Sequence, residues 1–332
     1  MKVRFGYVAM SVQLENASPS KTMTMKTFSK LADRPAALRR LESIARENLH
    51  NTLRLLKHNR YMDVHVYRLT SKLIPLATHG DLEDWDPYTP LAEAFAEVGA
   101  FAKEHEIRLS FHPDHFTVLS TPRPEVYASS VKDLAHHVKM LEMMGLDERA
   151  TCNIHVGGTY GDKEAAGRRF VEHFGELEPR IARRITLEND DKTFTASETL
   201  AICERVGAPM VLDLHHHAVN NPGGIEAEAL WPRILRTWDR RYGGNLPPKI
   251  HASSPKNAGD PRGHADYVDP LPLVDFLTRV APDTPAVDVM IEAKRKDESL
   301  FRLMEDLKRL EADGAPIAVT GGAGIEVYCK RS

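Results

Sequence analysis

Clusters of metal-binding residues recur at the ends of short β-type runs between Phe111 and Glu292. They lie in the segments FHP, NIHVGG, ITLEND, VLDLHHH, PKIHASS, GHADY and VMIEAK. Side chains this far apart in sequence converge only if the runs are strands of one closed sheet. This spacing therefore predicts a barrel that carries a cluster of metal ions in its mouth.

Short β-rich runs alternate with longer stretches of helical period, which is typical of βα units on a parallel sheet. We expect eight strands, at residues 3–9, 64–69, 107–112, 151–156, 185–189, 210–214, 249–253 and 287–293. We expect helices between them at residues 35–57, 89–105, 124–144, 163–180, 197–206, 225–240, 271–280 and 298–313. Several of these helices begin with proline or a capping residue.

The chain contains 332 residues, a length that suits either one large barrel or two ordinary domains. The main alternative to a closed barrel is an open doubly wound sheet, but candidate sites on nearly every strand favour closure. We therefore predict an α/β fold consisting of one (β/α)8 TIM-barrel domain over residues 1–332. Residues after about 314 are expected to form a C-terminal extension that covers the bottom of the barrel.

Composition and charge are those of a soluble globular protein, with 42% hydrophobic and 27% charged residues. No apolar run is long enough to span a bilayer, and the N-terminus turns polar too soon for a signal peptide, so we expect a cytoplasmic protein. A net charge of −3 excludes a uniformly basic coat without excluding a local basic patch. The three cysteines, Cys152, Cys203 and Cys329, are expected to be reduced and mostly buried.

Residues two apart on a strand share a face. On four expected strands this rule pairs Ser110 with His112, Asn153 with His155, Thr186 with Glu188, and Lys249 with His251. If this face points inward, one cavity receives five candidate ligands, namely His112, His155, Glu188, His251 and Glu292.

Four strand-end histidines joined by three carboxylates indicate metal binding, because carboxylates buried together cost too much unless cations neutralise them. Nitrogen and oxygen ligands without cysteine suit Mn²⁺, Zn²⁺ or Fe²⁺. So many ligands leave room for two or three ions.

Periodicity leaves three positions open. Strict alternation favours His215 as the partner of Asp213, whereas His216 fits only if the chain has already turned into its loop. His264 lies outside any expected strand. Lys249 is a cation beside expected metal ions, so it either binds a substrate phosphate, is carboxylated to an anionic ligand, or extends to solvent.

No competing nucleotide or hydrolase motif is present: there is no P-loop, no GxGxxG after a first strand and no GxSxG elbow. Instead, an ordered set of motifs resembles the UV damage endonuclease family, repair enzymes with a TIM barrel and a divalent metal cluster. The resemblance covers nearly the whole chain, through RFGYVAMS, VYRLTSKLIPLATH, FHPDHFTVLSTPR, NIHVGGTYGDK, LENDDKTF, VLDLHHH, PKIHASSPK, HADYVDP and IEAKRKD.

The resemblance implies two or three divalent ions per chain, with Mn²⁺ the first choice and Zn²⁺ the second. It selects His216 over His215, includes His264, and aligns Lys249 with an active-site lysine for which carboxylation is a reasonable hypothesis. It also implies catalytic roles for Glu188, Lys249 and His251. The metal shell that it implies is His112, His155, Glu188, Asp213, His216, His251, His264 and Glu292, with Lys249 added if carboxylated.

The resemblance further implies a monomer that acts on double-stranded DNA. Such an enzyme nicks immediately 5′ to cyclobutane dimers and 6-4 products and leaves a 3′-hydroxyl and a 5′-phosphate. Family members insert a Gln-Tyr pair at the lesion, and the matching positions here are His115 and Phe116. Tyr7 matches a first-strand tyrosine and either lines the lesion pocket or packs in the barrel core.

Two other classes of function remain open at this point. The same barrel and metals suit an apurinic-site endonuclease or a sugar isomerase or epimerase, although isomerases usually manage with fewer ligands. A non-catalytic lesion-binding protein is the third hypothesis, and an intact ligand set disfavours it.

Overall fold

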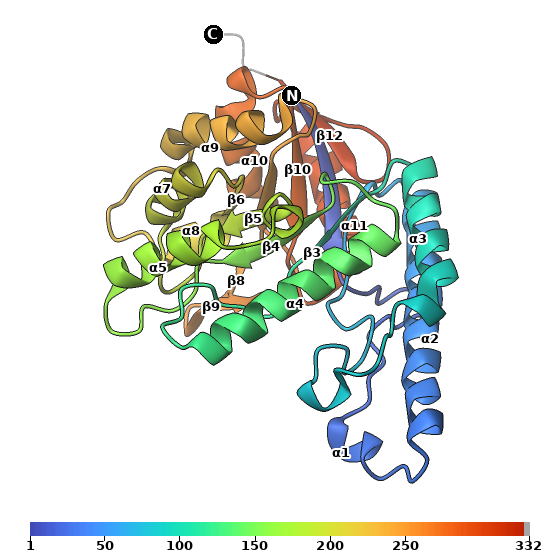
Figure 1. Ribbon diagram of the computed structural model, residues 1–332. Coiled ribbons are helices and arrows are strands. Elements are labelled where there is room, and N and C mark those ends of the chain that lie inside the picture. The colour runs from blue at the N-terminus through green and yellow to red at the C-terminus, as the bar shows by residue number, and fades with distance from the viewer. Residues whose placement is uncertain (329–332) are drawn as a thin grey trace.

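The computed structural model describes residues 1–328, and eight parallel strands in it close into a barrel (Figure 1). Parallel pairing runs continuously around the sheet and returns from β10 to β1, which confirms the predicted TIM barrel. The barrel strands are β1 (Lys2–Val8), β2 (Val66–Arg68), β3 (Arg108–Phe111), β4 (Thr151–His155), β5 (Ile185–Glu188), β6 (Met210–Asp213), β7 (Lys249–Ala252) and β10 (Ala286–Ile291).

Eight long helices cover the outside of the barrel, one after each strand. They are α2 (Arg34–Tyr61), α3 (Ala92–Glu104), α4 (Pro124–Met143), α5 (Lys163–Gly175), α7 (Ala196–Val206), α9 (Ala227–Tyr242), α10 (Pro270–Val280) and α11 (Lys296–Ala312). The prediction of one continuous helix over residues 163–180 is wrong beyond Gly175. The chain leaves α5 at Gly175 and starts a separate short helix, α6 (Pro179–Ala182), because Pro179 suits a first helical turn.

Several short elements were not expected from the sequence. They are α1 (Met25–Phe28), η1 (Gly80–Leu82), η2 (Thr89–Leu91), α8 (Leu214–Val219), η3 (Ala281–Asp283) and the antiparallel hairpin of β8 (Pro255–Asn257) and β9 (Asp260–His264). His264 is the last residue of β9, which corrects the expectation that it lies outside any strand. In Figure 1 this hairpin lies at the end of the barrel opposite the N-terminus.

Side chains alternate between the barrel interior and the helix layer, as strand geometry requires. The outward residues, such as Tyr67, Leu109 and Phe111, belong to the main hydrophobic core between strands and helices. Inside the barrel, Val8, Val66 and Met290 form a small separate apolar cluster.

A buried ion-pair group occupies the interior at the N-terminal ends of the strands. Arg4 Nε and Arg108 Nη1 donate to the two carboxylate oxygens of Asp288 at 2.8 and 2.7 Å. The two guanidinium groups lower the pKa of Asp288 against the opposing effect of burial. The bottom of the barrel is therefore closed by charge pairing as well as by packing.

The last described strands, β11 (Ile317–Val319) and β12 (Gly324–Val327), form a hairpin that pairs antiparallel with the beginning of β1. Ile317, Ile325 and Val327 are buried, so this hairpin joins the main core. Figure 1 places it beside the N-terminus, at the end of the barrel remote from the β8–β9 hairpin.

Cys152 and Cys203 are buried and free, as expected, while Cys329 lies outside the described residues. Within residues 1–328, no helix is both long and apolar enough to cross a bilayer.

Candidate metal centre and active site

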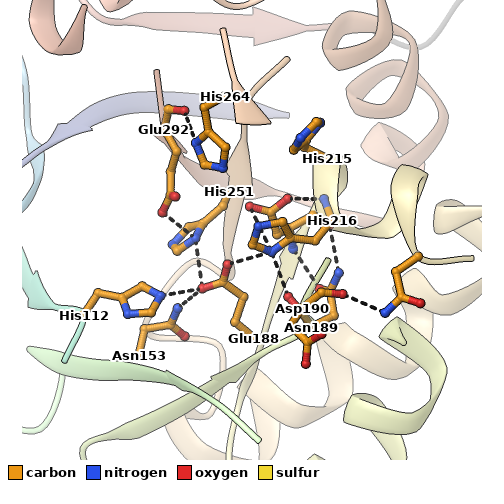
Figure 2. Close-up of polar contacts among 12 residues, drawn as sticks. His112, Asn153, Glu188, Asn189, Asp190, His215, His216, His251, His264 and Glu292 are labelled. Atoms are coloured by element: carbon orange, nitrogen blue, oxygen red, sulfur yellow. Dashed lines mark hydrogen bonds and ion pairs between the residues drawn. The ribbon is translucent and has the colours of Figure 1, made fainter. Parts of the chain in front are cut away.

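Glu188, at the C-terminal end of β5, lies at the centre of the polar cluster inside the barrel (Figure 2). Its Oε2 is 3.1 Å from His112 Nε2 and 3.2 Å from His251 Nδ1. Asn153 Nδ2 donates to the same oxygen. These neighbours come from β3, β4 and β7, so closure of the barrel is what brings them to one carboxylate.

Three groups of side chains around Glu188 can each hold a metal ion. Within each group, the ligand atoms lie within 4.8 Å of one another. Glu188 belongs to all three groups, so it is the one side chain that each candidate site shares. The groups are His112, His155 and Glu188; Glu188, Asp213 and His216; and Glu188, His251 and Glu292.

The structure resolves the choice between His215 and His216. Strand β6 ends at Asp213, and α8 begins at the next residue, so alternation no longer applies to the histidines. Asp213 caps α8 by accepting from the backbone N–H of His216 at 2.7 Å. His216 Nδ1 then lies 3.4 Å from Glu188 Oε1 and 3.7 Å from Asp213 Oδ2. The His215 Nε2 atom instead lies 3.3 Å from the backbone oxygen of Arg262.

Glu292 and His264 lie on the β10 side of the cluster (Figure 2). Glu292 Oε1 is 3.0 Å from His251 Nδ1. His264 Nδ1 lies 2.7 Å from the backbone oxygen of Glu292, a contact that orients the ring and leaves Nε2 as the available ligand atom. The His264 ring is 6.1 Å from the His216 ring, and His264 belongs to none of the three groups.

The donor set fits divalent cations. Four buried polar atoms of the cluster form no hydrogen bond of good geometry, namely His155 Nδ1, Glu188 Oε1, Asp213 Oδ2 and His251 Nδ1, although His251 Nδ1 and Glu188 Oε1 have ion-pair neighbours within 3.4 Å. Buried polar atoms are normally paired, so unpaired lone pairs that converge on one place indicate a bound ion. Imidazole nitrogen and carboxylate oxygen suit Mn²⁺, Zn²⁺ or Fe²⁺.

Ion pairs between histidine and carboxylate side chains link the members of the cluster. Burial opposes charge on His216, but Asp213 and Glu188 raise its pKa to about 11. In the same way, burial is outweighed at His251 by Glu188 and Glu292, which raise its pKa to about 9. Although burial disfavours its ionised form, Glu188 has a pKa held well below the usual range by His251 and His155.

Lys249 is buried two residues below His251 on the same face of β7, so it does not extend to solvent. Its Nζ donates to Ser110 Oγ at 2.9 Å, across the barrel from β3. Burial, reinforced by Arg108, lowers the pKa of Lys249 well below the usual value. A buried, readily deprotonated amine at this depth has the chemistry that carboxylation by CO₂ requires.

The structure does not bring Tyr7 to the cluster. Its side chain is fully buried on the outer face of β1, where its hydroxyl donates to Asn59 Oδ1 of α2 at 2.6 Å. The rings of Tyr7 and Tyr67 pack edge to face at 5.3 Å. Alternation sends its neighbours Gly6 and Val8 inward and Tyr7 outward, so Tyr7 occupies a core position rather than one that can line a lesion pocket.

His115 and Phe116 lie on the loop that joins β3 to α4. This loop begins at His112, and His115 follows three residues later. Phe116 is 74% exposed, and the two ring centroids lie 4.0 Å apart. An exposed aromatic side chain on a loop beside a catalytic cleft is typical of a binding residue rather than a packing one.

Two residues that sequence reasoning did not assign to the site contact it directly. Asn153 orients Glu188 and accepts from Thr186 Oγ1 at 2.9 Å. Arg68 donates from Nη1 to Glu292 Oε1. Both stand on the inward face of their strands, so the alternation that selected His155 also identified Asn153, and it would have found Arg68 at the end of β2.

The family model described as UV-endonuclease UvdE matches residues 3–319. The chain belongs to the UV-endonuclease UvdE family. A UV DNA damage endonuclease of Halalkalibacterium halodurans is 45% identical over 98% of the chain and 99% of the relative. One from Bacillus velezensis is 43% identical over 93% of the chain and 95% of the relative.

The crystal structure of SacUVDE matches 94% of the chain and 99% of its own chain, with a TM-score of 0.78 and 29% identity. These findings confirm the UvdE resemblance and the predicted class of enzyme, a phosphodiester-cleaving hydrolase.

Two more distant structures share the barrel of the UvdE chain. Endonuclease IV from Thermus thermophilus matches 93% of the chain and 99% of its own chain, with a TM-score of 0.54 at 14% identity. A xylose isomerase domain protein from Planctomyces limnophilus matches 78% of the chain and 91% of its own chain, with a TM-score of 0.51 at 13% identity. At such identities the similarity reflects the fold alone, so neither match supports the apurinic-site or isomerase alternatives.

Proposed function

We propose that this protein nicks double-stranded DNA immediately 5′ to ultraviolet photoproducts, both cyclobutane dimers and 6-4 products, and leaves a 3′-hydroxyl and a 5′-phosphate. The observation that carries the proposal is the convergence of three candidate metal groups on Glu188 in a chain of the UvdE family. We further propose that the active form is a monomer holding two or three divalent ions, most readily Mn²⁺.

The proposed ligands are His112, His155, Glu188, Asp213, His216, His251, His264 and Glu292. When bound, the ions supply activation of the attacking water and neutralisation of charge on the phosphodiester. Asn153 holds Glu188 in place, and Asn189 holds Asp213 by accepting from its backbone N–H at 2.9 Å and donating to its carbonyl at 3.0 Å. The Asn153 contact limits rotation of the Glu188 carboxylate, and the Asn189 contacts fix the backbone from which the Asp213 carboxylate projects.

Lys249 is proposed as an active-site residue in carboxylated form. Its deprotonated amine attacks the carbon of CO₂ and loses a proton, which converts a cation into an anionic carbamate. The carbamate is a ninth candidate ligand and removes a positive charge from beneath the ions. Mass spectrometry of the intact protein at alkaline pH with bicarbonate would reveal the addition of about 44 mass units, the mass of one CO₂.

The exposed His115 and Phe116 pair is proposed to enter the duplex at the lesion. A damaged dinucleotide is already poorly stacked, so extruding it costs less than extruding normal bases. A ring that fills the gap recovers part of the lost stacking, on the order of 1–3 kcal/mol per base. Without a tyrosine hydroxyl at Phe116, the selection among lesions rests on stacking and on His115.

A direct assay tests this proposal. The purified protein with Mn²⁺ is given a duplex carrying one thymine dimer, the same duplex undamaged, and one with an abasic site. We expect a single nick 5′ to the dimer whose ends are sealed by DNA ligase once the lesion is photoreversed. Failure to nick across several divalent metals would overturn the proposal, and preferential cutting at the abasic site would favour an apurinic-site endonuclease instead.

A further inference from the structure

Arg68, the last residue of β2, contacts the cluster with a positive charge. Its Nη1 donates to Glu292 Oε1, and the two side chains are 17% and 11% exposed. Among the described residues, it is the only lysine or arginine in an ion pair with a member of the three metal groups. A fixed cation beside divalent ions is repelled unless an anion lies between them.

Apolar side chains fill the barrel interior on the N-terminal side of Arg68, so its side chain does not point toward the bottom of the barrel. Arg68 pairs in register with Val8 and Ser110, and the apolar side chains of Val66 and Met290, which cluster with Val8, fill the next inward-facing level below. The guanidinium therefore extends into the mouth, toward the side on which substrate enters. Burying an unpaired Arg68 guanidinium among these apolar side chains would cost several kcal/mol.

We propose that Arg68 binds a phosphate of the cleaved strand once ions have engaged Glu292. This inference rests on the proposed function, because it assigns a substrate-binding role within the same site. The planar guanidinium donates two parallel hydrogen bonds to phosphate oxygens, a geometry that lysine cannot reproduce.

The opposing interpretation is that Arg68 only orients Glu292 as a metal ligand. The two roles differ in what is lost when Arg68 is replaced. A phosphate contact affects DNA affinity and its dependence on salt, whereas an orienting contact affects the number of metal ions bound.

The test compares wild-type protein with Arg68→Met and Arg68→Lys. Affinity for a nicked duplex, which represents the product and is not cut again, is measured with Mn²⁺ over a range of salt concentrations, and metal per chain is measured by mass spectrometry. We expect Arg68→Met to weaken binding about tenfold or more, and to reduce the slope of log affinity against log salt by about one. Arg68→Lys should keep the slope and recover part of the affinity, and metal content should stay unchanged.

Arg233→Met is the control, since Arg233 is also paired with a glutamate, donating to Glu204 at 3.0 and 2.6 Å between α9 and α7. It removes the same charge and should not change binding. Metal loss in Arg68→Met with affinity intact, or no change at all, would overturn the proposal. Binding does not depend on nicking, so a wild-type protein that binds through Arg68 yet fails to nick dimers would refute only the proposed function.

Discussion

Glu188 is the side chain that all three candidate metal groups share, and it is buried at the end of β5. Glu188→Gln keeps the shape of this side chain and removes its charge. We expect nicking to fall at least about 100-fold, because one carboxylate oxygen and the bridging charge are lost together. DNA affinity measured by fluorescence anisotropy should change little, since the DNA contacts proposed for Arg68, His115 and Phe116 do not involve the Glu188 side chain.

The control for this variant is its thermal melting profile. A protein that melts cooperatively but cannot nick supports the proposed role of Glu188. Loss of folding would instead show that Glu188 is needed mainly to neutralise its buried histidine neighbours.

The raised pKa values of His216 and His251 predict how metal loading depends on pH. A pKa of about 11 or about 9, against about 6.5 for a free imidazole, means that both rings are protonated at neutral pH in the ion-free protein. Metal ligation requires neutral rings, so each ion displaces protons. We expect apparent Mn²⁺ affinity to rise about tenfold or more per pH unit between pH 7 and 9.

Calorimetry in buffers of different ionisation enthalpy measures these protons directly. The stabilisation that the two raised pKa values give the ion-free fold is complete below about pH 6.5 and declines as pH rises toward about 9 and about 11. The melting temperature of the ion-free protein should therefore fall above about pH 7. His215→Ala serves as control, and an affinity independent of pH would contradict the assignment of His216 and His251 as ligands.

At the level of elements, the loop after β3 carries the pair that we propose to recognise the lesion, apart from the proposed metal ligands. Phe116 is 74% exposed, so Phe116→Ala should leave stability within about 0.5 kcal/mol. We expect the preference for dimer-containing over undamaged duplex to fall about tenfold, because stacking at the gap is lost. Competition binding measures this preference.

Tyr61, which is 86% exposed near the end of α2, offers a matched aromatic control. Tyr61→Ala should leave the preference for damaged DNA unchanged. If both substitutions lowered the preference for damaged DNA equally, Phe116 would have no specific role in lesion recognition.

At the level of the whole molecule, the barrel depends on the hairpin of β11 and β12. This hairpin pairs with Lys2, Val3 and Arg4 of β1, so residues from both ends of the chain form one sheet. Ile325 is buried in the main core. Ile325→Ala should destabilise the protein by about 2–5 kcal/mol.

Urea unfolding monitored by circular dichroism measures that loss. Leu271→Ala is the control, since Leu271 is 61% exposed and its truncation should have little effect. Equal stability of the Ile325→Ala variant and wild type would show that the hairpin is not part of the folding unit.

The sequence by itself determined the barrel and most of its inward face. Strand periodicity and strand ends are local properties, so Ser110, Asn153, Thr186 and Lys249 were placed on the inward face with their neighbouring ligands before any tertiary contact was known. The structure shows Lys249 bonded to Ser110 across the barrel and Asn153 bonded to Glu188 on the neighbouring strand, in agreement with that pattern.

Only the tertiary structure decided the residues where regular strands stop. His216 faces Glu188 because β6 turns into α8 at Leu214, and His264 orients on Glu292 because an unexpected hairpin carries it there. Tyr7 faces away because β1 packs against α2 on that side. Arg68 contacts Glu292 because closure of the barrel brings the ends of β2 and β10 to the same mouth. Contacts between strands that are distant in sequence depend on this closure and not on a local sequence pattern.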